Sequence, residues 1–504
     1  MNTTTSIHTD VLIIGAGISG IGLAAHLRQK CPDRQIKILE RREHIGGTWD
    51  LFQYPGIRSD SDMSTFGFNF KPWRQSKVLA DGASIVQYLQ ETVAEYDLEP
   101  LISFGQNVLQ AHYDSSRRLW TVTVEDTHRQ TQQHYETEFL AYCTGYYNYD
   151  AGFMPNYPEQ EQFKGRLIHP QHWPKDLDYQ GQRIVVIGSG ATAITLVPSL
   201  IQGGAAHVTM LQRSPTYVAS IASVDRIHQH LRRWLPEQTA YQITRAKNIA
   251  IQRGSYLLSQ RFPKLMRFAL LKSVQAQLGQ QIDIKHFSPH YQPWDQRLCV
   301  VPDGDLFKVL KSGQASVETD QIEAFVEQGI RLQSGKVLPA DIIVSATGLN
   351  LQMFGGMQVQ CDQQPFVAAE HALYNAVLPS HLPNCAILMG YTNASWTLKV
   401  DLAADYLCRL LNYMQQQGYD EVVASSPNTT WSDDTIMGSL HSGYVRRAAD
   451  VMLRQGRSAP WIVTHNYLKD RKMFKAQDFK DPILQFSKPR GSADTPEIAS
   501  SREI

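Results

Sequence analysis

TDVLIIGAGISGIGLAAHL, residues 9–27, carries the strongest structural signal in this chain. Four apolar residues ending at Ile14 predict a buried parallel strand, and small apolar residues after Gly20 predict a helix. Gly15, Gly17 and Gly20 between them have the G-x-G-x-x-G spacing. The first glycine permits a tight turn, the second lets the backbone approach a pyrophosphate, and the third lets the helix pack closely on the strand.

The next apolar run supports the same interpretation. QIKILE at 35–40 predicts a second strand, and it ends in Glu40, twenty residues after Gly20. In dinucleotide-binding folds a carboxylate at this place accepts hydrogen bonds from the two hydroxyls of a ribose. Unpaired N–H groups at the start of the helix bind the phosphates. Strand, turn, helix and acid together predict a dinucleotide site.

The pattern recurs in QRIVVIGSGATAITLVPSL at 182–200, where Gly188, Gly190 and Ala193 take the glycine positions. The following strand, HVTMLQR, ends in Arg213 where the first copy has an acid. A carboxylate would repel a 2′-phosphate, whereas arginine can pair with it. The first site is therefore predicted to bind FAD and the second NADPH. Arg213 could also be a solvated charge at a strand end.

Composition narrows the class of protein. Lys and Arg number 48 and Asp and Glu number 48, so no basic excess points to nucleic acid. The six cysteines form no CxxC pair, which excludes a disulfide-reductase motif and fits a reducing, cytoplasmic location. The first ten residues have no signal-peptide features. The 17 histidines show no metal-ligand spacing, so no metal is predicted. Two nucleotide sites indicate a flavoprotein reduced by a nicotinamide: a reductase, an oxidase or a monooxygenase.

One segment favours a monooxygenase among these three classes: FKGRLIHPQHWP at 163–174. It resembles the F-x-G-x-x-x-H-x-x-x-W-(P/D) fingerprint of type I Baeyer–Villiger monooxygenases. In that family the segment links the FAD and NADP domains, and its histidine is associated with domain movement rather than with proton abstraction. The alternative is an ordinary linker with a packed tryptophan. The fingerprint positions here are Phe163, Gly165, His169, Trp173 and Pro174.

Other segments extend the resemblance over about residues 9–480. GGTWDLFQYPGIRSDSD at 46–62, PWDQRL at 293–298 and SATGLN at 345–350 are similar to family blocks. YPGIRSDSDM at 54–63 and GYTNASWTLK at 390–399 resemble the ethionamide-activating subgroup. Trp396 in the last run could line the pocket or belong to the core.

The resemblance implies a set of site residues. For FAD these are Gly15, Gly17, Ser19, Gly20, Glu40, Gly47, Thr48, Trp49, Asp60 and Val108. For NADP they are Arg58, Ser59, Gly188, Gly190, Ala191, Thr192, Ala193, Arg213 and Ser214. Many family members have a lysine before the active-site arginine, where this chain has Gln296, so the preference for NADPH depends on Arg213 and Ser214.

The resemblance also implies the reaction. NADPH reduces FAD, and the reduced flavin takes up O₂ as a C4a-peroxyflavin. The deprotonated peroxide converts ketones to esters or lactones, and its protonated form sulfoxidises thioethers. Arg297 is the implied catalytic cation and Asp60 the acid that orients it; a buried salt bridge without chemistry is the structural alternative. A heteroatom monooxygenase with little ketone activity, or an uncoupled NADPH oxidase or reductase, stays open.

The expected fold is α/β, with two doubly wound, Rossmann-like, three-layer domains and a helical insert. The FAD domain is expected at 1–145 and 345–504, the NADP domain at 150–220 and 293–344, the insert at 221–292, and a disordered tail at 486–504.

Residues 225–290 of the insert carry 11 basic and three acidic residues. Phe262, Leu265, Met266, Ala269 and Leu270 are expected on one helix stripe, with Arg261, Lys264 and Arg267 beside it. The insert could wall the substrate pocket or make weak peripheral contact with an anionic membrane.

Overall fold

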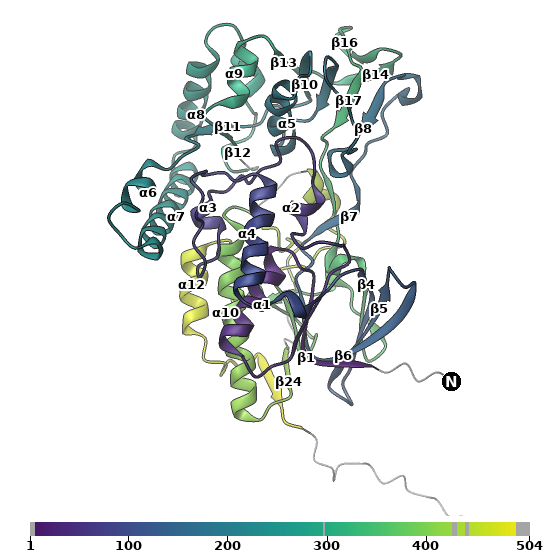
Figure 1. Ribbon diagram of the computed structural model, residues 1–504, viewed down its shortest axis with the longest axis vertical. Helices are drawn as coiled ribbons and strands as arrows, with labels where there is room; N and C mark the ends of the chain where they lie inside the picture. The colour runs from purple at the N-terminus through teal and green to yellow at the C-terminus, as the bar shows by residue number, and fades with distance from the viewer. Residues whose placement is uncertain (1–5, 296–297, 426–430, 439–442, 490–504) are drawn as a thin grey trace, which may run out of the picture.

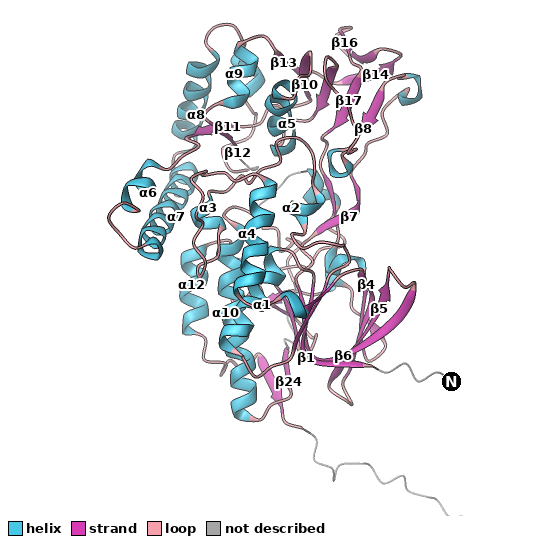
Figure 2. Cartoon of the chain, in the orientation of Figure 1, coloured by secondary structure: helices cyan, strands magenta, loops and turns pink. Residues whose placement is uncertain are grey.

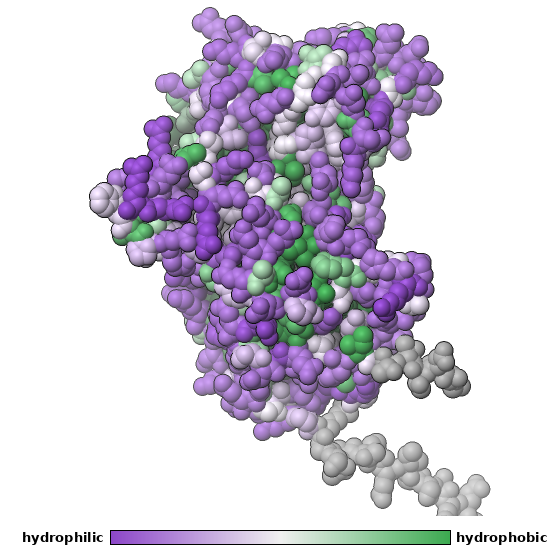
Figure 3. Space-filling model, in the orientation of Figure 1, coloured by the Kyte–Doolittle hydropathy of each residue, from purple (hydrophilic) through white to green (hydrophobic). Residues whose placement is uncertain are grey.

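The chain folds into two bodies, one below the other in Figure 1. The computed structural model describes residues 6–295, 298–425, 431–438 and 443–489. The lower body contains the first glycine turn and the upper body the second. Figure 3 shows a largely hydrophilic surface, with apolar residues in a band over the middle of the face in view.

The lower body is built on a mixed sheet. Its strands are β1 (Ile7–Ile14), β2 (Ile36–Leu39), β3 (Ile102–Ser103), β4 (Gln106–Asp114), β5 (Leu119–Asp126), β6 (Thr131–Tyr142), β19 (Gln358–Cys361), β20 (Gln364–Pro365) and β23 (Cys385–Ile387). Among the described residues the sheet has nine strands, in the order β20-β19-β4-β5-β6-β1-β2-β3, with β23 also paired to β6. β1 pairs in parallel with both β2 and β6, and parallel strands of this kind are usually buried on both faces.

Alternation along β1 explains its four apolar residues. Val11 and Ile13 pack into the core beneath the helices, and Leu12 and Ile14 pack into a second core on the opposite face of the sheet. Helices α1 and α10 lie against each other on the first face. The helices of this body are α1 (Ile18–Lys30), α2 (Thr48–Leu51), α3 (Met63–Phe66), α4 (Gly82–Glu95), α10 (Trp396–Gln417), α11 (Gly443–Arg447) and α12 (Tyr467–Ala476).

The upper body has a parallel sheet. Its strands are β8 (Arg166–Ile168), β9 (Arg183–Ile187), β10 (His207–Gln212), β13 (Ala315–Thr319) and β17 (Ile342–Ser345), and its helices are α5 (Ala191–Gln202) and α9 (Asp305–Lys311). The five strands found in the described chain run in the order β13-β10-β9-β17-β8. Figure 2 shows them beside the helices. The predicted strand-turn-helix unit is thus present in both bodies, and the doubly wound α/β fold is confirmed.

The two faces of the upper sheet are covered differently. Ile184 and Val186 pack with α5 and α9, whereas Val185 and Ile187 pack against a small antiparallel sheet. That sheet consists of β14 (Ile322–Val326), β15 (Gly329–Leu332) and β16 (Val337–Pro339). The third layer of this body is therefore made of strands.

Two short antiparallel strands connect the bodies. The chain leaves the lower body through β7 (Tyr147–Gly152) and returns through β18 (Leu349–Leu351). At the other end of the chain, β24 (Glu421–Ala424) pairs with β25 (Leu484–Ser487). The expected disordered tail is therefore wrong at its first two residues, 486 and 487, because they pair with β24. Residues 490–504 lie outside the described residues.

The insert contains α6 (Arg226–Leu231), α7 (Glu237–Arg261) and α8 (Pro263–Leu278). α7 packs on α3 of the lower body, and α8 packs on α9 and β11 (Val218–Ile221), which pairs with β12 (Cys299–Pro302). Pro263 separates the two helices because its ring favours a first helical position and cannot continue a preceding helix. Within the described chain, no helix has the length and apolar character needed to cross a membrane.

The expected apolar stripe of α8 is not buried as one face. Phe262, Leu265 and Ala269 are exposed, whereas Met266 and Leu270 are half-buried. The prediction of one stripe did not specify its burial, and the structure leaves most of this stripe uncovered. The helix buries mainly its C-terminal half, at Val274 and Leu278.

Candidate active site

One cavity lies between the first glycine turn and the N-terminal turn of α5. Its volume is about 330 Å³, within the range of ligand pockets. It is lined by the β1–α1 turn, the end of β2, the segment from α2 to residue 61, and the first turns of α5. Of the predicted site residues it brings together Gly15, Gly17, Ser19, Glu40, Gly47, Thr48, Trp49, Arg58, Ser59, Asp60, Val108, Ala191 and Thr192.

Glu40 lies in the wall of this cavity at the end of β2. Its carboxylate accepts hydrogen bonds from the Ala16 N–H at 2.7 Å and from the Arg42 N–H at 2.9 Å. Burial raises the pKa of this carboxyl above its ordinary value. The acid is thus fixed next to the glycine turn, where its remaining acceptor capacity faces the cavity.

The two helix starts at the cavity fit phosphate groups. Gly17 and Gly190 are the N-cap residues of α1 and α5, and neither helix has a side-chain cap. A Cβ added at Gly17 would approach the Cα of Gly47 at 3.6 Å, so two glycine backbones form a narrow part of the wall. A Cβ at Gly190 would meet no atom within 4 Å. Backbone N–H groups at such helix starts bind phosphate.

Asp60 and Arg58 follow α2 and line the same cavity. Ser61 Oγ lies 3.5 Å from Asp60 Oδ1. Arg58 Nη1 donates to Asp305 Oδ2 at 2.7 Å, and Asp305 is the first residue of α9 in the upper body. Ser59 is buried and donates to the Ser61 carbonyl. Arg297, the predicted catalytic cation, and Gln296 lie outside the described residues.

Six predicted cofactor residues do not line the cavity. Gly20 packs against the turn instead: a Cβ there would lie 1.9 Å from the Gly15 carbonyl oxygen, so only glycine allows this approach. Arg213 and Ser214 are exposed just after β10. The six residues are Gly20, Gly188, Gly190, Ala193, Arg213 and Ser214.

The fingerprint residues pack within the upper body and at its connection to the lower one. A Cβ at Gly165 would lie 2.3 Å from the Asp341 carbonyl oxygen, just before β17. Trp173 packs against the core beneath α5, and Phe163 is buried in the core on the opposite face of the sheet. Pro174 accepts a hydrogen bond from the Leu177 N–H. No fingerprint residue lines the cavity.

His169 holds the returning chain. Its Nε2 donates to the Gly348 carbonyl at 3.1 Å, and its Nδ1 accepts from the Gln171 N–H at 3.2 Å. Burial lowers the pKa of the ring, which favours this neutral tautomer. Gly348 directly precedes β18, so His169 lies at the connection between the two bodies.

Sequence reasoning missed several lining residues. Tyr146, Tyr147 and Tyr149 follow β6, and Gln352 and Met357 follow β18. A signal was available for the tyrosines, because β6 is a neighbour of β1 and the carboxyl ends of parallel strands meet at one edge. No comparable signal marks Gln352 or Met357.

Trp396 lines the cavity and also packs against the core. Its Nε1 donates to Ser19 Oγ at 2.8 Å, which joins the start of α10 to the start of α1. Both interpretations of this residue therefore hold.

A second, smaller cavity lies beside the first. Ile249, Gln252 and Tyr256 of α7 line it, and Ala394 lines both cavities. The insert therefore lines this second cavity, whereas none of its described residues lines the main one, and the expectation that it walls the substrate pocket stays a prediction.

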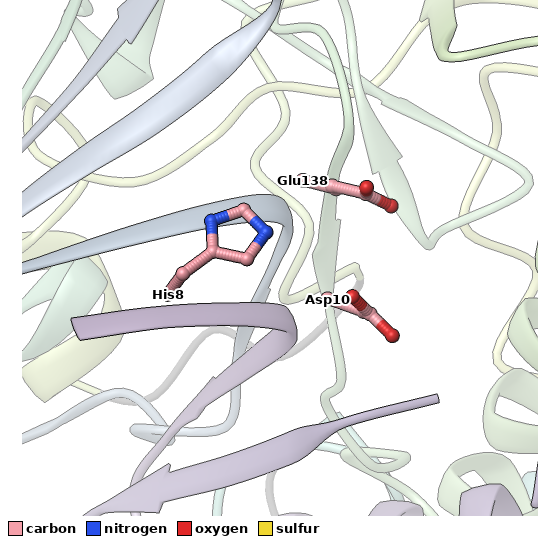
Figure 4. A group of neighbouring side chains, drawn as sticks. All are labelled: His8, Asp10 and Glu138. Carbon is pink, nitrogen blue, oxygen red and sulfur yellow. The ribbon is translucent and has the colours of Figure 1, made fainter. Parts of the chain in front are cut away.

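Figure 4 shows His8, Asp10 and Glu138, whose side-chain ligand atoms lie within 4.8 Å of one another. Asp10 accepts from the Gln35 N–H, and Glu138 pairs with Arg34 at 3.5 Å. These carboxylates already have partners within the protein, and the group lies outside the lining of the main cavity.

Comparison with known proteins agrees with this geometry. Residues 8–415 match the family described as flavin-binding monooxygenase-like. The chain is 61% identical to a probable FAD-binding monooxygenase, AlmA, of Acinetobacter baylyi, covering 95% of this chain and 96% of the relative. It is 49% identical to the FAD-containing monooxygenase EthA of Mycobacterium tuberculosis, with 95% and 98% covered.

Solved structures share the fold. An oxidised steroid monooxygenase bound to NADP superposes with a TM-score of 0.77 at 19% identity, covering 96% of this chain and 100% of that one. An open structure of cyclohexanone monooxygenase gives a TM-score of 0.74 at 18% identity, with the same coverage.

Proposed function

Because this chain belongs to the flavin-binding monooxygenase-like family, we propose that it is an FAD-dependent monooxygenase that uses NADPH and O₂. Relatives at 61% and 49% identity are named for FAD. The steroid monooxygenase of the same fold was solved with NADP bound. Residues 1–145 and 345–504 are the proposed FAD domain, whose described part is the lower body, and residues 150–220 and 293–344 are the proposed NADP domain, whose described part is the upper body.

One observation carries the proposal: the first glycine turn with Glu40 and the N-terminus of α5 line the same cavity. A nucleotide held at each would bring its reactive ring into a shared space. Glu40 would accept hydrogen bonds from a ribose diol, and the uncapped starts of α1 and α5 would bind the phosphates. Arg213 and Ser214 would bind the 2′-phosphate from the surface side.

The finer proposal is Baeyer–Villiger oxygenation. Flavin, when bound and reduced, supplies the activation of O₂. A ketone, O₂, NADPH and a proton yield an ester or lactone, water and NADP⁺; a thioether yields a sulfoxide with the same reductant. Asp60 would orient Arg297, whose cation would stabilise negative charge on the reacting oxygen. The fingerprint at 163–174 supports this proposal, and the runs at 54–63 and 390–399 support the ethionamide-activating subgroup.

The test measures NADPH consumption under ¹⁸O₂ with cyclohexanone, a linear ketone and methyl phenyl sulfide, followed by mass spectrometry. Labelled ester or lactone together with labelled sulfoxide is the expected result. Sulfoxide alone would indicate a heteroatom monooxygenase. Hydrogen peroxide with no labelled product would contradict oxygen transfer and indicate an uncoupled oxidase.

A further inference from the structure

The junction of α7 and α8 exposes a group of apolar side chains. Ile251, Leu257, Leu258, Phe262, Leu265 and Phe268 are each between 42% and 62% exposed. We call these six residues the insert tip. They come from the last turns of one helix and the first turns of the next, where Pro263 interrupts the chain direction.

The charge around the insert tip has one sign. Residues 238–278 contain seven Lys and Arg and no Asp or Glu, in a chain whose formal net charge is zero. Two of the seven, Arg245 and Lys247, are paired with Asp401 and Asp225. Arg261, Lys264 and Lys272 are exposed, and within the described chain none of them has an acidic partner. The Arg261 guanidinium lies 5.6 Å from the Phe262 ring, and the Lys272 ammonium 5.8 Å from the Phe268 ring. Basic and apolar side chains are thus interleaved.

We propose that the insert tip docks on an anionic lipid bilayer. Apolar side chains of an interfacial helix enter the boundary between headgroups and acyl chains, and flanking basic side chains bind anionic headgroups. Arg261, Lys264 and Lys272 can extend along the surface while Phe262, Leu265 and Phe268 insert. The protein lies on the bilayer in this arrangement.

The helix that presents the tip is firmly held. Arg245 of α7 donates to the carbonyls of Ser64 and Gly67 and to Asp401 Oδ2 at 3.2 Å. Asn248, one turn further on, donates to Asp62 Oδ1 at 2.7 Å. Because these contacts fix α7 on the lower body, little ordering of the backbone opposes docking.

Other occupants fit the surface less well. A symmetric dimer through this patch would bring two surfaces of the same positive sign together, which is repulsive. Single-stranded nucleic acid uses aromatic platforms for base stacking. Four of the six tip residues are aliphatic, and these partition into lipid rather than stack on bases.

The test is sedimentation of the full-length, FAD-loaded protein with vesicles. Vesicles of phosphatidylcholine alone are compared with vesicles containing phosphatidylglycerol, at low salt and at about 0.15 M salt. We expect sedimentation only with the anionic vesicles, and release by salt. Lys264→Gln/Lys272→Gln should weaken partitioning about 25-fold, at about fivefold per basic residue. Phe262→Ser/Leu265→Ser should weaken it about tenfold or more.

The matched control is Lys164→Gln/Lys311→Gln, which removes two exposed lysines of the upper body and should bind like the wild type. Flavin absorbance and melting temperature verify that each variant is folded. Absence of sedimentation with anionic vesicles at low salt would overturn the proposal, as would equal loss in the control. If the wild type is a dimer that dissociates in Phe262→Ser/Leu265→Ser, the patch binds a second copy of the chain. If oligo-dT fully displaces the protein from the vesicles, the patch binds nucleic acid.

Discussion

Arg58 and Asp305 tie the two bodies together beside the main cavity through a 2.7 Å ion pair. Both side chains are largely buried, and only Nη1 of the guanidinium reaches the carboxylate. Nη2 is buried and has no hydrogen-bond partner among the described residues. Arg58 therefore has an unused donor, and we propose that a phosphate or carboxamide oxygen of the nicotinamide nucleotide accepts from it once the side chain turns toward the cavity.

Arg58→Ala should raise the KM for NADPH by about 10- to 150-fold, because a charge-assisted hydrogen bond contributes about 1.5–3 kcal/mol. Asp305→Asn should leave KM unchanged or lower it, since the carboxylate competes for the same cation. The double variant should resemble Arg58→Ala. The KM for NADPH of the wild type, the two single variants and the double variant gives a double-mutant cycle. An equal rise in KM in both single variants would show that the ion pair serves only to join the two bodies.

Glu40→Gln should reduce FAD content and weaken FAD binding by about 10- to 150-fold, because it removes a buried anionic acceptor. The absorbance ratio of flavin to protein measures this. Glu43→Gln is the control, since Glu43 is exposed three residues away and should retain normal flavin. Normal flavin content in Glu40→Gln would show that another group holds the ribose.

The pH dependence of flavin binding should follow Glu40. Burial raises the pKa of this carboxyl, so it gains a proton at a higher pH than an ordinary glutamate. The protonated form is the weaker acceptor, so flavin should be released as pH falls through this raised pKa. Fluorescence of released flavin measures the midpoint. The Glu40→Gln variant should not show this pH-dependent release of flavin. If the release persists in the variant, another titrating group causes it.

Arg213→Ala should reduce the preference for NADPH over NADH, mainly through KM and by about 10- to 150-fold. Arg213 is exposed after β10, where a 2′-phosphate could reach it from solvent. Lys311→Ala, an exposed charge of the same body, is the control. Equal use of both nucleotides by the wild type would refute the assignment.

Arg297→Ala should abolish ester formation from ketones while FAD content stays normal, because the residue belongs to neither glycine turn. Sulfoxidation should be less impaired, since sulfur reacts with the protonated oxygen donor and needs no neighbouring cation. Arg297→Lys should restore little activity, because an ammonium is more strongly hydrated and lacks the planar fork. Ester and sulfoxide yield per NADPH consumed are the measurements, and an undiminished ester yield would make Arg297 structural.

The fold was largely predictable because its determinants are local. Gly15 and Gly20 fix the first turn, and β1 needs apolar residues on both of its faces, so a short run of sequence contains both signals. The position of Glu40 follows from the length of α1 and the next loop. The same pattern at Gly188 identified the second body.

The rest of the site depends on distant contacts. Trp396 reaches Ser19 across 377 residues, and Met357 enters the cavity from a segment without a local pattern. The exposure of α8 could not be predicted from the sequence either. An amphipathic pattern predicts an apolar and a polar face but does not say what, if anything, covers the apolar one. Only the packed structure shows that Phe262 and Leu265 are left uncovered.

The bond between Arg245 and Asp401 spans 156 residues, and it has a consequence for synthesis of the chain. α7 is translated well before the segment that neutralises its buried guanidinium. At about 5–20 residues per second, the ribosome needs roughly 8 to 30 seconds to add Asp401 after Arg245. During that interval α7 can contact only the segment around α3, through the carbonyls of Ser64 and Gly67, and the buried guanidinium of Arg245 still lacks its carboxylate partner.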